Sequence, residues 1–202
     1  GSGQLTGIWG TGPTDIWVTS SVWENAILHY DGTGWTRFAT PGIGGLEDIW
    51  GADSNDIWAV NNGGVVHYDG TSWSEVQPGS FLWLNGVWGS ASDDVWAVGG
   101  GGGDRLLHYD GTSWTSQLVP AGVGMLYAIW GSGASDVWAV GEAGGVIHFD
   151  GTSWSVVSIG TAFDLTTVWG SSPQDIWVKW TFHFQWTSWT QTPLDTPSVY
   201  GG

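Results

Sequence analysis

The side chains of this chain that could do acid–base or metal chemistry recur at regular intervals. Each of the five histidines begins a His-Tyr or His-Phe pair, and they stand far apart in the sequence: His29, His67, His108, His148 and His183. A metal centre needs several ligands within about 2.1 Å of one ion. Histidines distributed one to a repeat do not supply that, so we interpret them as residues of a sheet and expect no metal site and no cofactor.

Nine of the nineteen acidic residues also recur in two series. One series precedes an Ile-Trp or Val-Trp pair, and the other stands in the motif Asp-Gly-Thr: Asp15, Asp56, Asp94, Asp136 and Asp175, then Asp31, Asp69, Asp110 and Asp150. Asp-Gly between two apolar runs is a strong hairpin signal, because both residues tolerate positive φ. These aspartates are therefore expected to form turns, with a calcium role as the alternative.

The remaining acids offer one candidate for catalysis, the neighbouring pair Glu47 and Asp48. Glycosidases use two carboxyl groups that face one substrate. Neighbouring residues of a regular strand point to opposite faces of the sheet, so this pair is poorly arranged for that chemistry. We expect no catalytic residues and a chain that is not an enzyme.

The elements that position these side chains come from an internal repeat. An [IV]WG motif recurs with a D[IV]W motif eight residues later, and a further tryptophan closes each of five units. Each unit has four short apolar runs separated by Gly, Asn, Asp, Ser and Pro. A repeat of about forty residues with four strands is typical of a β-propeller blade. We predict a single all-β domain, 1–202, a five-bladed propeller of four-stranded antiparallel blades at approximately 4–40, 45–79, 83–120, 125–160 and 164–194.

The last unit departs from this pattern. Gln185 and Trp186 replace Asp-Gly, and the segment 178–186 alternates apolar and polar residues, as one long strand would. Residues 195–202 are expected to be a closing strand or the start of a sixth repeat. We favour a closed five-bladed ring, with a longer parent of six or seven blades, or closure through oligomerisation, as the alternative.

Composition excludes several classes of partner. The formal net charge is −16, with only three basic residues. Binding to nucleic acid requires clustered Lys and Arg, so we expect no nucleic-acid partner. No run of apolar residues is long enough to cross a bilayer, so no membrane insertion is expected. The chain has no cysteine, which excludes disulfides and thiolate metal ligands.

Units of the type IWGxxxxDIWAVxxxGxxHYDGTSW resemble the Trp-rich tectonin and tachylectin-like propellers and the bacterial fucose-binding propeller lectins. The resemblance covers nearly the whole chain. It implies a secreted or surface-bound bacterial protein that binds glycans or glycoproteins through shallow sites between blades or at loop ends.

The candidate contacts for a sugar are aromatic residues outside the repeat pattern and the amides beside them, because sugars stack on aromatic rings and need polar partners. They are Trp23, Asn25, Trp83, Asn85, Trp180 and Trp186. The predicted function is a carbohydrate-binding module. The alternatives are a non-catalytic protein-interaction scaffold, favoured by the diverse loops between the second and third strands, and a five-bladed glycosidase.

Overall fold

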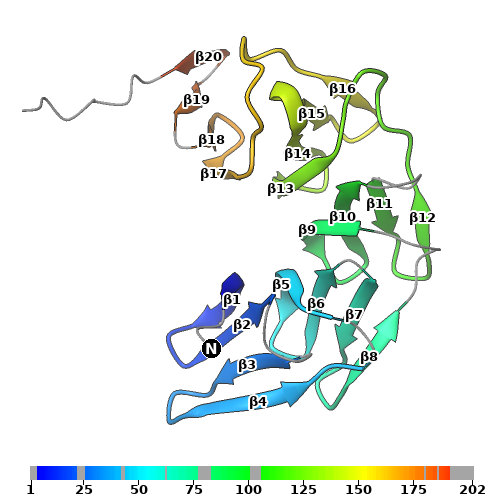
Figure 1. Ribbon diagram of the computed structural model, residues 1–202, viewed down its shortest axis with the longest axis vertical. Helices are drawn as coiled ribbons and strands as arrows, with labels where there is room; N and C mark the ends of the chain where they lie inside the picture. The colour runs from blue at the N-terminus through cyan, green and yellow to red at the C-terminus, as the bar shows by residue number, and fades with distance from the viewer. Residues whose placement is uncertain are drawn as a thin grey trace, which may run out of the picture.

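The computed structural model describes residues 4–21, 26–41, 44–61, 63–76, 83–100, 106–179, 181–185 and 187–191. In this part of the chain, five antiparallel sheets of four strands follow one another in sequence order (Figure 1). The predicted all-β propeller with five blades is confirmed. The described residues include no helix with the length and apolarity needed to cross a bilayer.

Each blade is a meander whose first strand lies innermost and whose fourth lies outermost. Blade 1 contains β1 (Leu5–Gly12), β2 (Asp15–Ser20), β3 (Ala26–Tyr30) and β4 (Trp35–Ala39). Blade 2 contains β5 (Leu46–Asp53), β6 (Asp56–Asn61), β7 (Gly64–Tyr68) and β8 (Trp73–Val76). Blade 3 contains β9 (Trp83–Ala91), β10 (Asp94–Gly100), β11 (Leu106–Tyr109) and β12 (Trp114–Ser116). Blade 4 contains β13 (Leu126–Gly133), β14 (Asp136–Gly141), the 3₁₀ turn η1 (Glu142–Gly144), β15 (Val146–Phe149) and β16 (Trp154–Val156). Blade 5 contains β17 (Val168–Ser172), β18 (Asp175–Val178), β19 (Phe182–Gln185) and β20 (Ser188–Gln191).

The Asp-Gly-Thr motifs form the turns between the third and fourth strands, as the sequence predicts. In blade 2, Asp69 Oδ1 accepts hydrogen bonds from the backbone N–H groups of Thr71 (2.9 Å) and Ser72 (2.8 Å). Gly70 takes a φ of +87°, which glycine adopts without a steric penalty. Turns of the same kind begin at Asp31, Asp110 and Asp150.

The fifth unit differs from its prediction. The segment 178–186 is not one strand, because β18 ends at Val178 and β19 begins at Phe182. Lys179 has a φ of +44°, and its carbonyl accepts a hydrogen bond from the Thr181 N–H at 2.5 Å. The apolar–polar alternation therefore runs through a tight hairpin. A short connection between two strands preserves the alternation, which is why the pattern alone did not reveal the turn.

An aspartate at the start of the second strand ties each blade together internally. In blade 4, Asp136 Oδ1 lies 2.7 Å from His148 Nε2 and accepts a hydrogen bond from Trp138 Nε1 at 2.9 Å. Its Oδ2 accepts one from the Ser132 hydroxyl at 2.5 Å. The Trp138 and His148 rings stack with centroids 4.0 Å apart. The same Asp–His contact occurs in all five blades: Asp15–His29, Asp56–His67, Asp94–His108, Asp136–His148 and Asp175–His183.

This contact confirms that the histidines are residues of the sheet. Burial by itself raises the pKa of Asp136, but the hydrogen bonds from His148, Ser132 and Trp138 outweigh burial and leave that pKa below its usual value. The aspartate is therefore ionised at neutral pH, when it accepts all three bonds. No group of three His, Asp or Glu side chains in the described part of the chain is arranged to hold a metal ion.

Neighbouring blades are joined by an indole that lies on a glycine. A Cβ built on Gly51 would lie 2.7 Å from Cη2 of Trp9, so only a hydrogen atom fits there. The contact repeats at every junction between described blades: Trp9 on Gly51, Trp50 on Gly89, Trp88 on Gly131 and Trp130 on Gly170. This explains why Trp and Gly are adjacent in the [IV]WG motif.

A second set of aromatic contacts seals the outer part of each junction. Trp17 of blade 1 packs against Tyr68 and Trp73 of blade 2, with ring centroids 5.1 and 5.9 Å away. Equivalent contacts join the later blades. The buried Leu, Ile and Val side chains fill the space between these two sets, which gives a separate apolar core at each of the four junctions.

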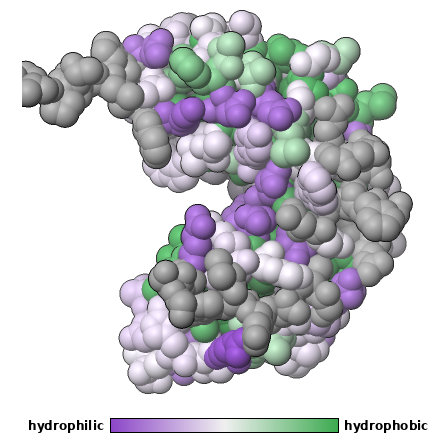
Figure 2. All heavy atoms as spheres, viewed as in Figure 1, coloured by the Kyte–Doolittle hydropathy of each residue, from purple (hydrophilic) through white to green (hydrophobic). Residues whose placement is uncertain are grey.

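The five blades form an open arc instead of the closed ring that we favoured from the sequence. Figure 1 shows β1 and β17 at the two ends of a C-shaped array, and Figure 2 shows the gap between the terminal blades as open space. The residues expected to form a closing strand or a sixth repeat, 195–202, lie outside the described part of the chain. Five blades of this repeat thus leave the ring incomplete.

The contact between Trp50 and Gly89 generates a testable prediction. In Gly89→Ala, the new methyl group would lie 2.6 Å from Trp50 Cη2 and 2.8 Å from the Asp94 carbonyl oxygen. Because the junction must shift to admit it, we expect a loss of about 1–3 kcal/mol of unfolding free energy, measured by thermal and denaturant unfolding. The matched control is Gly133→Ala, whose methyl group would meet nothing within 4 Å. Equal stability of the two variants would contradict this account of the junction.

Candidate functional site

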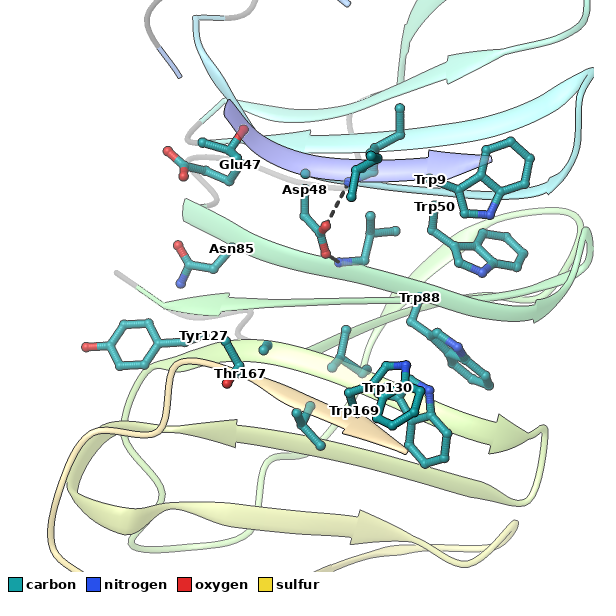
Figure 3. Close-up of a pocket in the computed structure, with 18 of the residues that line it drawn as sticks. Trp9, Glu47, Asp48, Trp50, Asn85, Trp88, Tyr127, Trp130, Thr167 and Trp169 are labelled. Carbon is teal, nitrogen blue, oxygen red and sulfur yellow. Dashed lines mark hydrogen bonds between the residues drawn. The ribbon is translucent and has the colours of Figure 1, made fainter. Parts of the chain in front are cut away.

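The inner strands of the blades line a channel of about 640 Å³ on the concave side of the arc. The two ends of this channel carry different side chains (Figure 3). One end is lined by indoles, those of Trp9, Trp50, Trp88, Trp130 and Trp169. Polar side chains from the beginnings of β5, β9 and β13 gather at the other end, which we call the mouth: Glu47, Asn85 and Tyr127. Thr6 of β1 and Thr166, which precedes β17, hold the same position in their repeats and also line the channel.

A β-bulge places the polar side chains of the mouth. In blade 2, Leu46 pairs with Asn61 and Asp48 with Val60, which leaves Glu47 as an extra residue on the inner strand. Asn85 in β9 and Tyr127 in β13 are extra residues in the same way. In β1, the register shift falls across Thr6 and Gly7. A bulge redirects a side chain and is frequent beside functional sites. Here it turns one residue per blade into the channel in blades 1 to 4.

The bulge residues differ although their surroundings are the same. The inner strands share the pattern Leu-x-x-[IV]-Trp-Gly, and the first variable position holds Thr, Glu, Asn, Tyr and Thr in successive blades. Because the local backbone is equivalent in the strands with bulges, folding does not require these differences. Variation among polar residues at one position of an otherwise constant repeat is expected where those residues contact a ligand.

Two of the bulge residues also bond to the next blade. Thr6 Oγ1 donates a hydrogen bond to the Leu46 carbonyl at 2.5 Å, and Asn85 Nδ2 donates one to the Leu126 carbonyl at 2.8 Å. The Asn85 amide oxygen stays available as an acceptor. Glu47 makes no side-chain hydrogen bond to any other described residue, so its carboxylate also faces the mouth as an acceptor.

Asp48 lies beside Glu47 but in the wall of the channel. Its two oxygens accept hydrogen bonds from the N–H groups of Ile49 (2.9 Å) and Val87 (3.0 Å), as the dashed lines in Figure 3 show. Asp48 thus joins blade 2 to the inner strand of blade 3. Part of its surface remains open to the channel, yet the surrounding protein raises its pKa to about 6, because desolvation outweighs the two hydrogen bonds.

Two further acids lie near Tyr127, one in η1 of blade 4 and one in the segment before β17. Glu142 Oε2 accepts a hydrogen bond from the Met125 N–H at 3.0 Å, and Asp164 Oδ1 accepts one from the Ala143 N–H at 3.0 Å. Burial raises the pKa of Tyr127, and the charges of Asp164 and Glu142 raise it further. The described cation nearby is Lys179, whose Nζ donates to the Asp164 carbonyl at 2.7 Å. The mouth is therefore negative and rich in acceptors.

Only some of the site residues predicted from the sequence lie in the described part of the chain. Trp83 is 53% exposed at the mouth end of β9, two residues before Asn85. The other predicted contacts, Trp23, Asn25, Trp180 and Trp186, lie outside the described residues. Sequence reasoning missed Tyr127, Thr6 and Thr166. Comparison of the five Leu-x-x-[IV]-Trp-Gly segments would have found them as the polar residues that vary in a constant frame.

The expectation for Glu47 and Asp48 needs a correction. Regular alternation would send the two side chains to opposite faces, but the bulge at Glu47 interrupts it. Both residues line the same channel. A strongly shifted pKa beside a second carboxyl group in a cavity is typical of functional sites, and strand geometry does not separate this pair.

A second cavity, of about 440 Å³, lies between blades 2 and 3. Its walls include the rings of Trp58, Tyr109 and Trp114. Thr112 also lines it, and here the blade departs from the others. The threonine hydroxyls of the other three Asp-Gly-Thr turns donate to the turn aspartate at 2.6–2.7 Å, whereas Thr112 bonds to Asp110 through its backbone N–H only. Its hydroxyl is thereby free to meet a ligand.

Comparison with known proteins supports the fold. By sequence, no family model and no curated protein matches the chain. By structure, the chain is similar to virginiamycin B lyase from Staphylococcus aureus, with a TM-score of 0.80, 14% identity and coverage of 96% of this chain and 71% of the lyase. YCF48 bound to a D1 peptide matches with a TM-score of 0.66, 13% identity and coverage of 94% and 66%. The WD40 repeats of RRP9 match with a TM-score of 0.71, 8% identity and coverage of 88% and 58%.

These similarities contradict one sequence prediction. We expected a chain that is not an enzyme, but virginiamycin B lyase is an enzyme and shares this fold over nearly the whole chain. The prediction is therefore wrong as an inference from the architecture. At 14% identity the likeness extends to the fold alone. The resemblance to tectonins and fucose-binding lectins stays a prediction.

The environment of Asp48 generates a prediction about pH. Its folded pKa of about 6 lies above the ordinary value of 3.8, so between these values the folded state holds a proton that the unfolded state has released. The contribution of Asp48 to the free energy of unfolding therefore falls as pH rises from about 4 to about 6. In Asp48→Asn this dependence is removed. We expect the Tm of the variant relative to the parent to increase between about pH 4 and pH 7.

Asp69 provides a control of opposite sign. The hydroxyl and N–H of Thr71, with the N–H of Ser72, lower its pKa to about 2, so it stabilises the fold at pH values above the ordinary pKa and loses this effect as pH falls toward 2. Asp69→Asn should therefore lose Tm relative to the parent as pH rises from about 2 to about 4. A parallel pH dependence of the two variants would refute the assignment for Asp48.

Proposed function

We propose that this chain is a binding protein whose channel mouth takes a peptide segment that carries lysine or arginine. The observation that carries the proposal is the ring of bulge residues, in which Glu47, Asn85 and Tyr127 occupy equivalent positions with different polar groups. Together they present carboxylate, amide and phenol groups to one ligand, and each is held by a rigid inner strand.

The charge of the mouth favours a cationic ligand. Glu47, Glu142 and Asp164 surround it, and the whole molecule carries a formal net charge of −16. A field of this sign attracts basic segments and speeds their association. Inside the mouth, an ammonium or guanidinium group would find charge-assisted acceptors in the Glu47 carboxylate and the Asn85 amide oxygen.

Exposed aromatic rings at the rim support the same ligand. Trp83 flanks Asn85, and Phe163, which is 72% exposed, lies beside Lys179 with the ammonium 5.8 Å from its ring centroid. Aromatic faces attract Lys and Arg side chains. The fold is also known to accept a peptide, since the YCF48 structure is described as bound to one. The channel volume lies within the range of ligand sites.

The test is binding of a fluorescein-labelled peptide rich in Lys and Arg, measured by fluorescence anisotropy. Glu47→Gln removes one charge at the mouth, and we expect it to weaken binding by about tenfold, since a hydrogen bond to a charged group contributes about 1.5–3 kcal/mol. Tyr127→Phe should weaken binding by a smaller factor. Both effects should shrink at high salt.

The matched control is Glu75→Gln, the same chemical change on the outer strand β8. If Glu75→Gln weakens binding as much as Glu47→Gln, the peptide is attracted by net charge alone and the mouth is not its site. A neutral peptide of equal length, which should not bind, completes the comparison.

We retain carbohydrate binding as a second candidate because the cavity between blades 2 and 3 suits it. The partly exposed rings of Tyr109 and Trp114 offer aromatic walls, and Thr112 and Ser113 offer hydroxyl groups. This is the combination of ring faces and polar groups that a sugar requires.

A glycan array distinguishes this second candidate. Thr112→Val, which removes the unbonded hydroxyl, should abolish any specific glycan signal. In Thr71→Val the lost hydroxyl is one that is bonded to Asp69 at 2.6 Å, so this control should lose stability and keep glycan binding. An array without signal for the parent chain would eliminate the carbohydrate candidate and leave the peptide proposal intact.

A further inference from the structure

The two terminal blades expose surfaces that are buried in every other blade. Ile8 on β1 is 72% exposed, whereas its counterparts in the later blades are 9% exposed or less: Ile49, Val87, Ile129 and Val168. Leu5 is exposed in the same way, and its counterparts are fully buried. The outward face of blade 1 is therefore a blade junction without a neighbour.

The outward face of blade 5 lacks the opposite half of the junction. Trp169 is 59% exposed, although its counterparts lie on a glycine of the next blade. Trp177 stacks on His183 of its own blade, and no other aromatic contact of Trp177 occurs among the described residues. Blade 5 thus presents two indoles that find partners at every internal junction.

The two exposed faces are complementary in kind. Blade 1 carries a junction glycine, Gly10, whose nearest atoms belong to Asp15 and Ile16 of its own blade. It also carries Tyr30 and the exposed Trp35, at the positions that meet the second-strand indole elsewhere. Blade 1 therefore exposes the glycine and the two aromatic rings that contact indoles at internal junctions. Blade 5 exposes the two indoles that make those contacts.

A protein segment that fills the gap must therefore carry both sets of junction residues, one facing blade 5 and the other facing blade 1. It needs a glycine and two aromatic rings toward blade 5, and a pair of indoles toward blade 1. Residues spaced as in the [IV]WG, D[IV]W and DGTSW motifs present this set, as the four internal junctions demonstrate. The occupant is thus defined by the repeat itself.

The length of the lyase chain indicates two further blades. The five blades cover 71% of the lyase chain at a TM-score of 0.80, so the uncovered remainder of that chain is about two fifths as long as the covered part, the length of about two repeats. A second copy of this chain would bring five blades into that space, three more than it can hold.

We propose that the gap is filled by a tandem pair of further blades of this same repeat type, which completes a seven-bladed ring. Each new junction is formed as the internal ones are, with Trp169 on a glycine of the sixth blade and an indole of the seventh blade on Gly10. The completed ring buries both terminal faces.

The test extends the chain by a second copy of residues 83–160, attached after residue 202. Trp169→Ala is then made in the chain as it exists and in the extended chain. We expect a change in Tm of only a few degrees in the former and of about 10 °C in the latter, because the indole is buried only when a sixth blade is present. Trp88→Ala, at an internal junction, is the control and should lower Tm in both.

Several results would overturn the proposal. If Trp169→Ala and Trp88→Ala lower the Tm of the existing chain equally while light scattering gives a monomer, the arc closes on itself. A dimer that Trp169→Ala dissociates would assign the faces to a second copy. An extended chain in which Trp169→Ala still has little effect would show that these faces are not blade junctions.

A measurement on the existing chain keeps the proposal testable if the extended chain does not fold. Ile8→Asp should leave Tm nearly unchanged and reduce binding of a hydrophobic dye, because Ile8 is exposed, while the matched Ile49→Asp should unfold the protein. Equal damage by the two changes would show that the face of blade 1 is already covered, and the proposal would fall.

Discussion

The architecture depends on the contact between an indole and a glycine hydrogen. At each junction, the indole of one inner strand lies where the next blade has no side chain, so two sheets approach more closely than any residue with a Cβ would allow. This approach brings the Leu, Ile and Val side chains of both blades into one core. It also fixes the tilt between blades, and with it the width of the channel and the curvature of the arc.

Inside each blade, a different device holds the outer strands. The Asp–His contact and the stacked Trp connect the second and third strands without using a neighbouring blade. In blades 1 to 4, an Asp-Gly turn then fixes the fourth strand. Because these contacts are local in sequence, each blade is a unit that needs its neighbours mainly to bury its two faces, as in other repeat proteins.

Most of the fold could be predicted from the sequence, but less of the candidate site could. Repeating motifs predicted the strands, the Asp-Gly turns and the role of the histidines, because those features follow from spacing and turn chemistry. The bulge at Glu47 and the hairpin at Lys179 were missed, since an inserted residue or a short turn leaves the apolar pattern nearly unchanged. The open arc was missed as well, because curvature arises from packing angles at four junctions, to which no single motif refers.

The bulges have a consequence for how such a protein can change over time. Thr6, Glu47, Asn85 and Tyr127 occupy equivalent sites on strands whose packing is supplied by neighbouring Leu, Ile, Val and Trp residues. Duplication of one blade would therefore copy the core residues together with a bulge position whose side chain can change without affecting that core. Each copy can then acquire its own side chain by a single codon change while its core remains the same, so a symmetric array can evolve an asymmetric recognition surface.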